Sequence, residues 1–255
     1  MKFRTMLLAS AAVMVASSAF AAEDITSAFY LPAQGKILSD TTLKTSRFKM
    51  DNDSVEKGLR AEETVTVGVA ENLAVFGRLG NEFNVDKEYN NNHNFDYTLG
   101  GKYNWTQDKL MAQVVAGYHT FDPRSWKGKA ENDNNKWEKF LFGQVKLGYE
   151  LDCGLTPYTT FQAVGNIDNG NREMEYSWFL GAHKLIDKTA LDLGVRYDFT
   201  TEDDHEQEWY AQGAVDYYVR DNVTVGVFGD YYLGGKGHKD VDYGYDLGLS
   251  AKVLF

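Results

Sequence analysis

Apolar side chains recur at every second position through most of the chain, and the last four segments show this best. Because a quarter of all residues are charged, an uncharged face this long would arise by chance about once in a thousand trials. Successive side chains of a strand point to opposite faces, so the pattern predicts strands with one apolar and one polar face. The uncharged face has 24 positions: Leu191, Leu193, Val195, Tyr197, Phe199, Trp209, Ala211, Gly213, Val215, Tyr217, Val219, Val223, Val225, Val227, Gly229, Tyr231, Leu233, Tyr243, Tyr245, Leu247, Leu249, Ala251, Val253 and Phe255. The interleaved positions carry ten charges: Asp192, Arg196, Asp198, Glu208, Asp216, Arg220, Asp230, Asp242, Asp246 and Lys252.

Followed backwards through the chain, the same period predicts twelve strands. The first is the least regular, since Gly35 to Phe48 alternates poorly, and Lys139 falls on the apolar face of the sixth. In this register Val225 lies on the apolar face and Thr224 on the polar face, so an arginine should be tolerated better at Thr224. The predicted strands are 33–46, 58–70, 73–84, 93–105, 110–121, 136–151, 155–166, 173–185, 189–200, 207–219, 223–233 and 240–255.

The connections between these strands fall into two classes. Short turns alternating with long loops are typical of an up-and-down transmembrane barrel, with turns in the periplasm and loops outside the cell. An even number of strands puts both chain ends on the periplasmic side. The short connections follow even-numbered strands: Glu71-Asn72, Thr106 to Lys109, Asp152 to Gly154, Asp187-Lys188 and Asp221-Asn222. The longer, polar ones follow odd-numbered strands: Arg47 to Lys57, Val85 to Asn92, Phe121 to Asn135 and Thr201 to Glu206.

Strand length separates a membrane barrel from a soluble one. The predicted strands run to 11–16 residues, whereas strands of soluble sheets usually have about 5–6. A lipocalin-like soluble carrier is the alternative, but that fold has eight strands and fits in fewer residues. In hydrocarbon every backbone N–H and C=O must be paired internally, so a spanning sheet must close. The fold class is therefore predicted to be all-β, with one closed antiparallel barrel of about twelve strands.

The first 21 residues form a segment of their own. Lys2 and Arg4 give it a positive start, Met6 to Ala16 is an apolar run, and Ala19-Phe20-Ala21 is a cleavage site with small residues. This pattern predicts a cleaved signal peptide at 1–21 and a barrel domain at 22–255. The single cysteine, Cys153, falls in a predicted turn and cannot form an intramolecular disulfide.

The polar face of the strands is the candidate functional surface, because it lines the interior of a barrel. Charged residues there can line an aqueous path and set its ion preference, or they can pair across a narrow lumen and fill it. Four phenylalanines that point inward, Phe140, Phe142, Phe179 and Phe228, would help to occlude it. The candidate pore-lining residues are Arg60, Glu62, Arg78, Glu82, Asp96, Lys102, Lys146, Glu150, Asp192, Arg196, Asp198, Glu208, Asp216, Asp230, Asp242 and Asp246.

The last strand carries the motif that is most specific to a known class. Its alternating residues Tyr243, Tyr245, Leu247 and Leu249, with a final Phe255, resemble the assembly signal of bacterial outer-membrane barrels. The whole chain after the signal peptide resembles the small porin-like members of this class. The resemblance implies outer-membrane localisation, contact with lipid and lipopolysaccharide, insertion by the barrel-assembly machinery, and passive diffusion of small solutes. It does not identify the solute.

Composition narrows the partners further. The formal charge of −11 disfavours nucleic acid, because a phosphate binder normally presents a basic face. The mean hydropathy of −0.44 fits a barrel in which only every second strand residue meets lipid. No phosphate-binding glycine motif is present, so no cofactor is predicted.

Catalytic and metal sites are weakly supported by the sequence. His93, His205 and His238 fall in or beside predicted outer loops, whereas His119 and His183 point inward. No serine motif accompanies any of them, so no catalytic residues are assigned. The stretch 203–206, Asp-Asp-His-Glu, is best interpreted as a solvated acidic loop. Neither this loop nor His238 with Asp240 and Asp242 matches a defined metal motif, so no metal site is predicted.

Three hypotheses about function follow. The preferred one is a porin-like channel for small solutes or ions. The second is a non-conducting barrel that acts through its outer loops, above all Phe121 to Asn135. The third is a lipid-modifying enzyme or protease that depends on His205 or His119.

Overall fold

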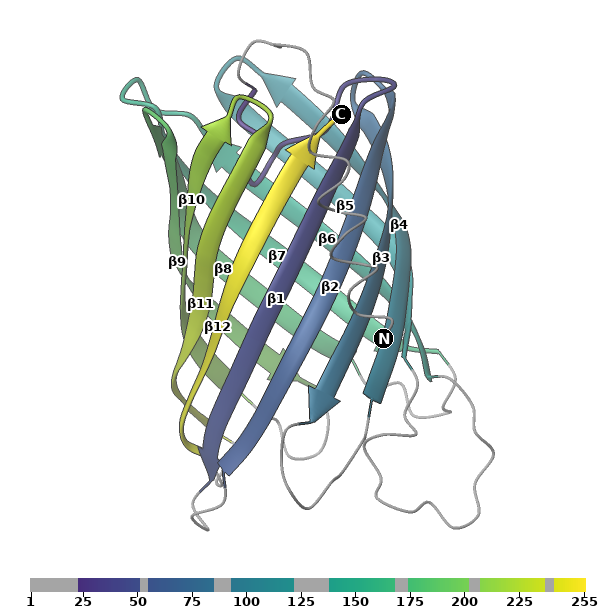
Figure 1. Cartoon of the computed structure of the whole chain (residues 1–255), viewed down its shortest axis with the longest axis vertical. Coiled ribbons are helices and arrows are strands. Elements are labelled where there is room, and N and C mark those ends of the chain that lie inside the picture. Colours follow the sequence, from purple (N-terminus) through teal and green to yellow (C-terminus); the bar gives the residue numbers. More distant parts are fainter. Residues whose placement is uncertain are drawn as a thin grey trace.

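A computed structural model describes residues 23–50, 55–84, 93–121, 138–167, 174–201, 207–236 and 241–255. Twelve strands form one closed antiparallel barrel in up-and-down order, as predicted (Figure 1). No helix in these ranges is long and apolar enough to cross a membrane. The strands are β1 (Ile37–Met50), β2 (Val55–Ala70), β3 (Leu73–Asn84), β4 (His93–Gln107), β5 (Leu110–Phe121), β6 (Glu138–Tyr149), β7 (Leu155–Asn166), β8 (Met174–Ile186), β9 (Thr189–Thr200), β10 (Gln207–Arg220), β11 (Val223–Lys236) and β12 (Val241–Leu254).

The barrel closes where the first strand meets the last. The ladder between β1 and β12 runs from Leu38 opposite Leu254 to Met50 opposite Val241. Beyond it, the Phe255 N–H donates to the Ile37 carbonyl at 2.8 Å, and the Ile37 N–H donates to the Phe255 carbonyl at 3.1 Å. The predicted role of the terminal strand as the closing strand is confirmed.

Short turns gather at the end of the barrel that also holds Phe255, which we term the turn end; the opposite end is the loop end (Figure 1). Two of these turns begin with aspartates in the left-handed region, Asp108 at φ 52° and Asp187 at φ 53°. Aspartate tolerates this region better than most residues, which suits it to tight hairpins. Cys153 lies exposed in another of these turns, as expected.

The predicted bounds of β3, β5, β7 and β9 agree with the structure, but those of the first strand are wrong. The strand begins at Ile37 rather than at residue 33, because Gly35 adopts φ 82° and turns the chain off the wall. It then continues to Met50, so Arg47 pairs with Lys57 where a loop was expected. Backbone pairing with β2 and β12 on both sides extends this strand despite its poor side-chain alternation.

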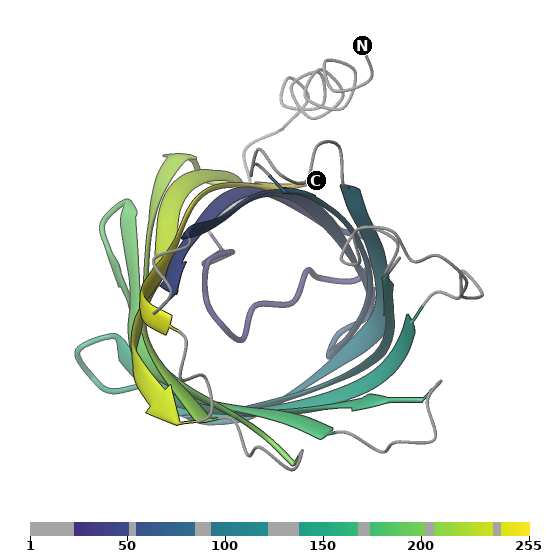
Figure 2. The ribbon, with the colours of Figure 1, turned by 90° about the horizontal axis from the view of Figure 1, so that it is seen from below.

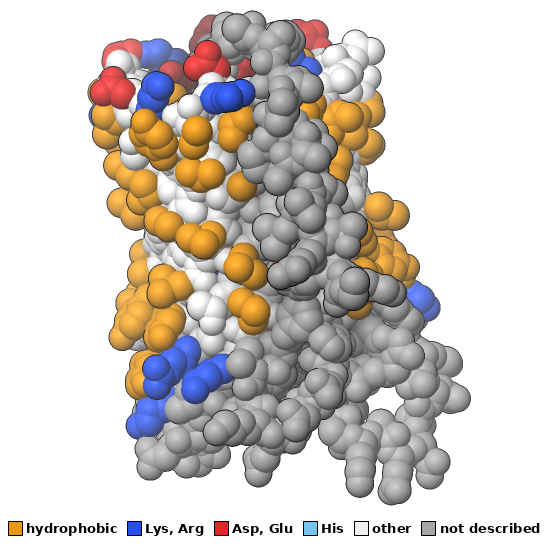
Figure 3. All heavy atoms as spheres, viewed as in Figure 1, with side chains coloured by type: hydrophobic (Ala, Val, Ile, Leu, Met, Phe, Trp, Pro, Cys, Tyr) orange, Lys and Arg blue, Asp and Glu red, His pale blue; other side chains and the backbone are white. Residues whose placement is uncertain are grey.

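The outer wall is apolar and exposed, which is the reverse of a soluble protein. Leu180, Leu193 and Leu249 are 62%, 61% and 58% exposed, whereas Gln113 and Asp96 are each only 2% exposed. Figure 3 shows apolar side chains over the middle of the wall and charged ones near both ends. A closed barrel with this outer band suits a hydrocarbon environment on its outside.

Stacked aromatic rings run around the outer wall near the loop end. The Tyr176 ring lies 4.9 Å from that of Phe199, and the Tyr197 ring lies 4.5 Å from that of Trp209. Aromatic girdles of this kind lie at the membrane interface in outer-membrane barrels.

The two faces of β6 allow a direct test of the register. Val145 is 44% exposed on the outer wall, while its neighbour Gln144 lines an interior cavity. We expect Val145→Arg to reduce the free energy of unfolding in lipid vesicles by about 2–4 kcal/mol, because a lipid-facing charge is costly. Gln144→Arg should cost less, as measured by reversible denaturant unfolding.

Equal losses for the two variants would contradict the register. The expectation that an arginine is tolerated better at Thr224 than at Val225 stays a prediction, and a local feature limits the difference. Thr224 does lie on the inner face, but it is 0% exposed and pairs directly with Lys252. A longer cationic side chain has no room there and would meet a like charge.

Candidate functional site

A segment that precedes the first strand, residues 23–36, lies inside the barrel at the turn end (Figure 2). The Lys146 ammonium donates to the carbonyl of Ala28 at 2.8 Å, and the Asn104 amide donates to the carbonyl of Phe29. The Phe29 ring meets that of Tyr158 edge-on at 5.9 Å. These contacts join the segment to β4, β6 and β7, so it crosses the lumen rather than following one wall.

Asp24 is the polar anchor of this segment. Its carboxylate lies 2.8 Å from His183 Nε2 and accepts a 2.9 Å hydrogen bond from the Tyr218 hydroxyl. His183 also approaches Asp192 at 3.5 Å, and Asp192 accepts a hydrogen bond from Tyr158 at 2.8 Å. Burial alone would raise the pKa of Asp24, but hydrogen bonds from His183 and from Thr26 outweigh it and lower the pKa to about 2.

Contacts between its own residues also hold the segment 23–36 in a compact conformation. Glu23 accepts hydrogen bonds from Lys36 at 2.6 Å and from the Tyr30 hydroxyl at 2.7 Å, and these two contacts, the Lys36 one first, lower the pKa of Glu23. Ile25 packs against Tyr218 and Leu254 in a small apolar cluster. Apolar burial and ion pairing thus stabilise the same compact conformation.

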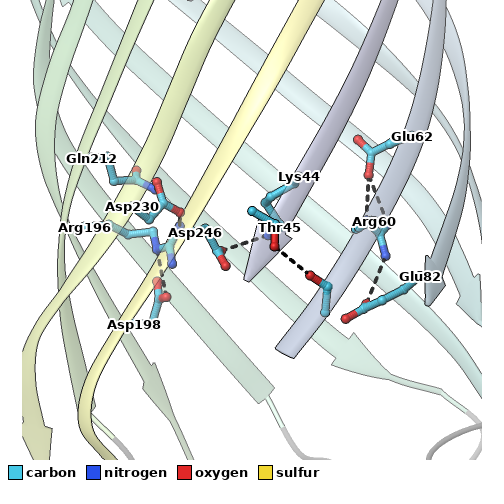
Figure 4. Close-up of polar contacts among 11 residues, drawn as sticks. Lys44, Thr45, Arg60, Glu62, Glu82, Arg196, Asp198, Gln212, Asp230 and Asp246 are labelled. Atoms are coloured by element: carbon cyan, nitrogen blue, oxygen red, sulfur yellow. Dashed lines mark hydrogen bonds and ion pairs between the residues drawn. The ribbon is translucent and has the colours of Figure 1, made fainter. Parts of the chain in front are cut away.

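The charged residues on the inner wall pair along the wall. Arg60 on β2 contacts Asp96 at 2.8 Å and Glu62 at 3.0 Å. On the other side, Arg196 on β9 contacts Asp198 at 2.8 Å and Asp230 at 3.2 Å. Figure 4 shows Arg60 with Glu62 and Arg196 with its two partners, and between them a third pair, Lys44 with Asp246 at 2.9 Å.

Each of these ion pairs joins residues of the same strand or of strands close together in the sheet. Arg60, for example, reaches Glu82 on the adjacent β3 at 3.7 Å. In the described part of the lumen, these ion pairs therefore lie against the wall instead of bridging the barrel.

Most of the candidate pore-lining residues lie on the inner face, and two need comment. Glu150 lies beyond the end of β6, exposed, with its N–H bonded to the Lys109 carbonyl in the turn region. It is at the rim of the turn end, because the strand stops at Tyr149. The side chain of Asp242 is outside the described residues. The residues that make contacts in the interior or line the cavity are Arg60, Glu62, Arg78, Glu82, Asp96, Lys102, Lys146, Asp192, Arg196, Asp198, Glu208, Asp216, Asp230 and Asp246.

The inward phenylalanines do not fill the lumen, because their rings lie over glycines of the wall. A Cβ added at Gly248 would lie 2.2 Å from Cζ of Phe228, and one added at Gly194 would lie 2.3 Å from Cζ of Phe179. The same arrangement places Phe142 over Gly117. The expected occlusion by these three rings is therefore wrong, since glycine lets each ring lie flat against the backbone. The fourth, Phe140, stacks on Phe121 at 5.6 Å near the loop end.

A cavity of about 700 Å³ lies in the lumen beside these rings. Its wall comes from β6 to β11 and includes Phe179, Phe228 and both partners of the Arg196 ion pairs. Lys146 and Tyr158 line it and also contact the segment 23–36, while Asp192 lines it and contacts His183, the partner of Asp24. The segment therefore lies next to the cavity on its turn-end side, although the cavity lining itself comes from the strands.

The two inward histidines have structural partners. His119 Nδ1 lies 2.9 Å from the Thr98 hydroxyl, and His183 lies between Asp24 and Asp192. His205 and His238 lie outside the described residues, as do the acidic stretch 203–206 and Asp240. Within the described ranges, no three or more His, Cys, Asp or Glu side chains are grouped to bind a metal ion.

Docking of the segment can be tested at its anchor. Because the pKa of Asp24 is lowered from 3.8 to about 2, its charge stabilises the docked segment at neutral pH, and this contribution is lost as the pH falls from about 4 to 2. Asp24→Asn should mimic that loss and weaken docking by about 1–3 kcal/mol. We expect faster hydrogen–deuterium exchange in residues 23–36 at pH 7, with strand amides unchanged.

Asp152→Asn is the matched control, because Asp152 is an exposed turn-end carboxylate paired with Lys109. Unchanged exchange in Asp24→Asn would contradict the assigned anchor.

Comparisons with known proteins give the fold but not the activity. No family model and no curated protein sequence matches this chain. Among solved structures, the COG4313 outer membrane channel from Pseudomonas putida F1 is 11% identical, with a TM-score of 0.71 over 91% of this chain and 100% of that one. The NanC porin is 10% identical, with a TM-score of 0.58 over 84% and 98% of the chains.

The similarity extends beyond channels. The β domain of the Bordetella autotransporter BrkA is 12% identical, with a TM-score of 0.56 over 87% of this chain and 100% of that one. At such low identity these matches establish the fold alone. The closed sheet, its apolar outer wall and these similarities show that the chain has the fold of a twelve-stranded outer-membrane β-barrel.

Proposed function

We propose that this protein is a channel for passive diffusion of small solutes across the outer membrane. The observation that supports this function best is the cavity of about 700 Å³ in the lumen, lined by β6 to β11. Polar and charged side chains line much of it, and the phenylalanine rings beside it lie against the wall. A lumen of this kind suits water and polar solutes.

The proposed orientation places the turn end in the periplasm and the loop end outside the cell, as in other outer-membrane barrels. Removal of residues 1–21 as a signal peptide would put the segment 23–36 at the start of the mature chain. The strand that ends at Phe255 would then engage the assembly machinery, and the outer wall would contact lipid and lipopolysaccharide. In this arrangement the segment restricts the periplasmic mouth.

The two other hypotheses have less support. A non-conducting barrel would act through its outer loops, and most of the loop Phe121 to Asn135 lies outside the described residues. An enzyme would need an available nucleophile and base, whereas His119 and His183 have the structural partners given above. Conductance recordings distinguish the channel from both of these hypotheses.

Purified protein in planar lipid bilayers should give discrete conductance steps. Deleting residues 23–32 should increase the unit conductance, because this removes most of the segment while keeping Lys36, which pairs with Gly68 at the start of β1. Reproducible silence of both proteins, with the barrel fold verified by circular dichroism, would refute the channel. An unchanged conductance after deletion would refute the restriction by the segment.

The position of the Phe228 ring gives a second test. In Gly248→Ala the new Cβ would lie within 2.7 Å of three Phe228 ring atoms, so the ring must move away from the wall into the lumen. We expect a lower unit conductance and a destabilisation of about 1–3 kcal/mol, as in other overpacked sites.

Gly143→Ala is the matched control, because a Cβ there meets nothing within 4 Å. Adding Phe228→Leu to Gly248→Ala should restore conductance. Equal conductance in Gly248→Ala and Gly143→Ala would show that this ring does not border the path.

A further inference from the structure

The residues that line the lumen cavity carry a net negative charge, which their hydrogen bonds do not remove. Two basic side chains line it, Lys146 and Arg196, against five acidic ones, so its formal charge is −3. The acidic residues are Glu175, Asp192, Asp198, Glu208 and Asp230. Charge at this density in a partly enclosed space raises the local concentration of solutes of opposite sign.

Both basic groups are already engaged within the protein. Arg196 is shared between Asp198 and Asp230, and the Lys146 ammonium donates to the Ala28 carbonyl of the segment 23–36. An anionic solute would have to compete with these partners. It would also approach a net negative wall, so anions are the least suitable occupants.

Neutral polyols gain no electrostatic advantage from this cavity. Some of its polar side chains are hydrogen-bonded to one another, since Gln144 donates to Gln162 at 3.1 Å and Gln212 donates to Asp230 at 2.9 Å. Each amide keeps further donors and acceptors, so these hydrogen bonds do not exclude polyols. They leave the net charge intact, and only a cation benefits from that charge.

The aromatic rings supply the second feature that a cation requires. The Phe228 ring lies over Gly248 and the Phe179 ring over Gly194, and both rings border the cavity, with the Tyr158 ring 5.2 Å from that of Phe179. Ring faces attract ammonium and guanidinium groups. The lumen already shows this contact elsewhere, with Arg196 4.4 Å from the Tyr210 ring centre and Lys102 5.0 Å from that of Phe76.

We propose that the cavity is a transit site for organic cations, in which Phe179 and Phe228 contact an ammonium or guanidinium group and the carboxylates of the wall supply the countercharge. This inference rests on the proposed channel and names its preferred solute class. A volume of about 700 Å³ is in the range of small-molecule sites and accommodates a solute of amino-acid size.

Arginine and citrulline are the probes, because they have nearly the same shape and differ by one positive charge. Liposomes that contain the full protein should swell faster in isosmotic arginine than in citrulline. Phe228→Leu should reduce the arginine-to-citrulline ratio about two- to fivefold, which is the strength expected of one cation–ring contact. Phe76→Leu is the control, since that ring also lies over a glycine but already faces Lys102.

Each outcome decides the proposal. Equal swelling in the two solutes would refute it, and so would a preference that Phe228→Leu and Phe76→Leu change equally. If the protein conducts no ions at all, the proposed channel is refuted, but the proposed cation site is not. Calorimetric titration of the detergent-solubilised protein then still tests the site, because arginine should bind more tightly than citrulline, and Phe228→Leu should remove that difference. Equal binding would overturn the inference.

Discussion

The pairing of β1 with β12 is the constraint on which the rest of the structure depends. A membrane supplies no water to satisfy backbone N–H and C=O groups, so an unpaired strand edge is unstable there. The ladder from Leu38 to Met50 and the two bonds between Ile37 and Phe255 remove both edges at once. Closure then divides every strand into a lipid-facing side and a lumen-facing side. That division produces the alternation seen in the sequence.

The alternation made strands predictable wherever the outward, lipid-facing positions carry apolar residues. β9, for example, has its predicted bounds and carries an apolar residue at nearly every outward position. β1 was misplaced because its outward positions include Thr41 and Thr45, which weaken the pattern. Its position is determined by backbone pairing and by the φ of 82° at Gly35, and neither is visible as a side-chain period.

No sequence pattern predicts that the segment 23–36 lies in the lumen. Residues 23–36 follow no period, and their contacts are distant in the chain, as in Asp24 with His183 and Ala28 with Lys146. The register correctly placed His183 inside, but only the folded barrel brings a carboxylate to it from the opposite end of the chain. Inward charges could be predicted from the sequence alone, whereas their partners could not.

Glycine and phenylalanine together explain why so many large inward residues are compatible with an interior cavity. An inward glycine lets the ring of a neighbouring strand lie against the backbone, as Phe228 does over Gly248. The inner-wall ion pairs described above also lie along the sheet instead of bridging the barrel. The segment 23–36 is then the described element that crosses the lumen, and its docking at Asp24 determines how far the turn end is restricted. In the proposed channel, the inner wall would therefore select the solutes, while the segment would set the width of the path.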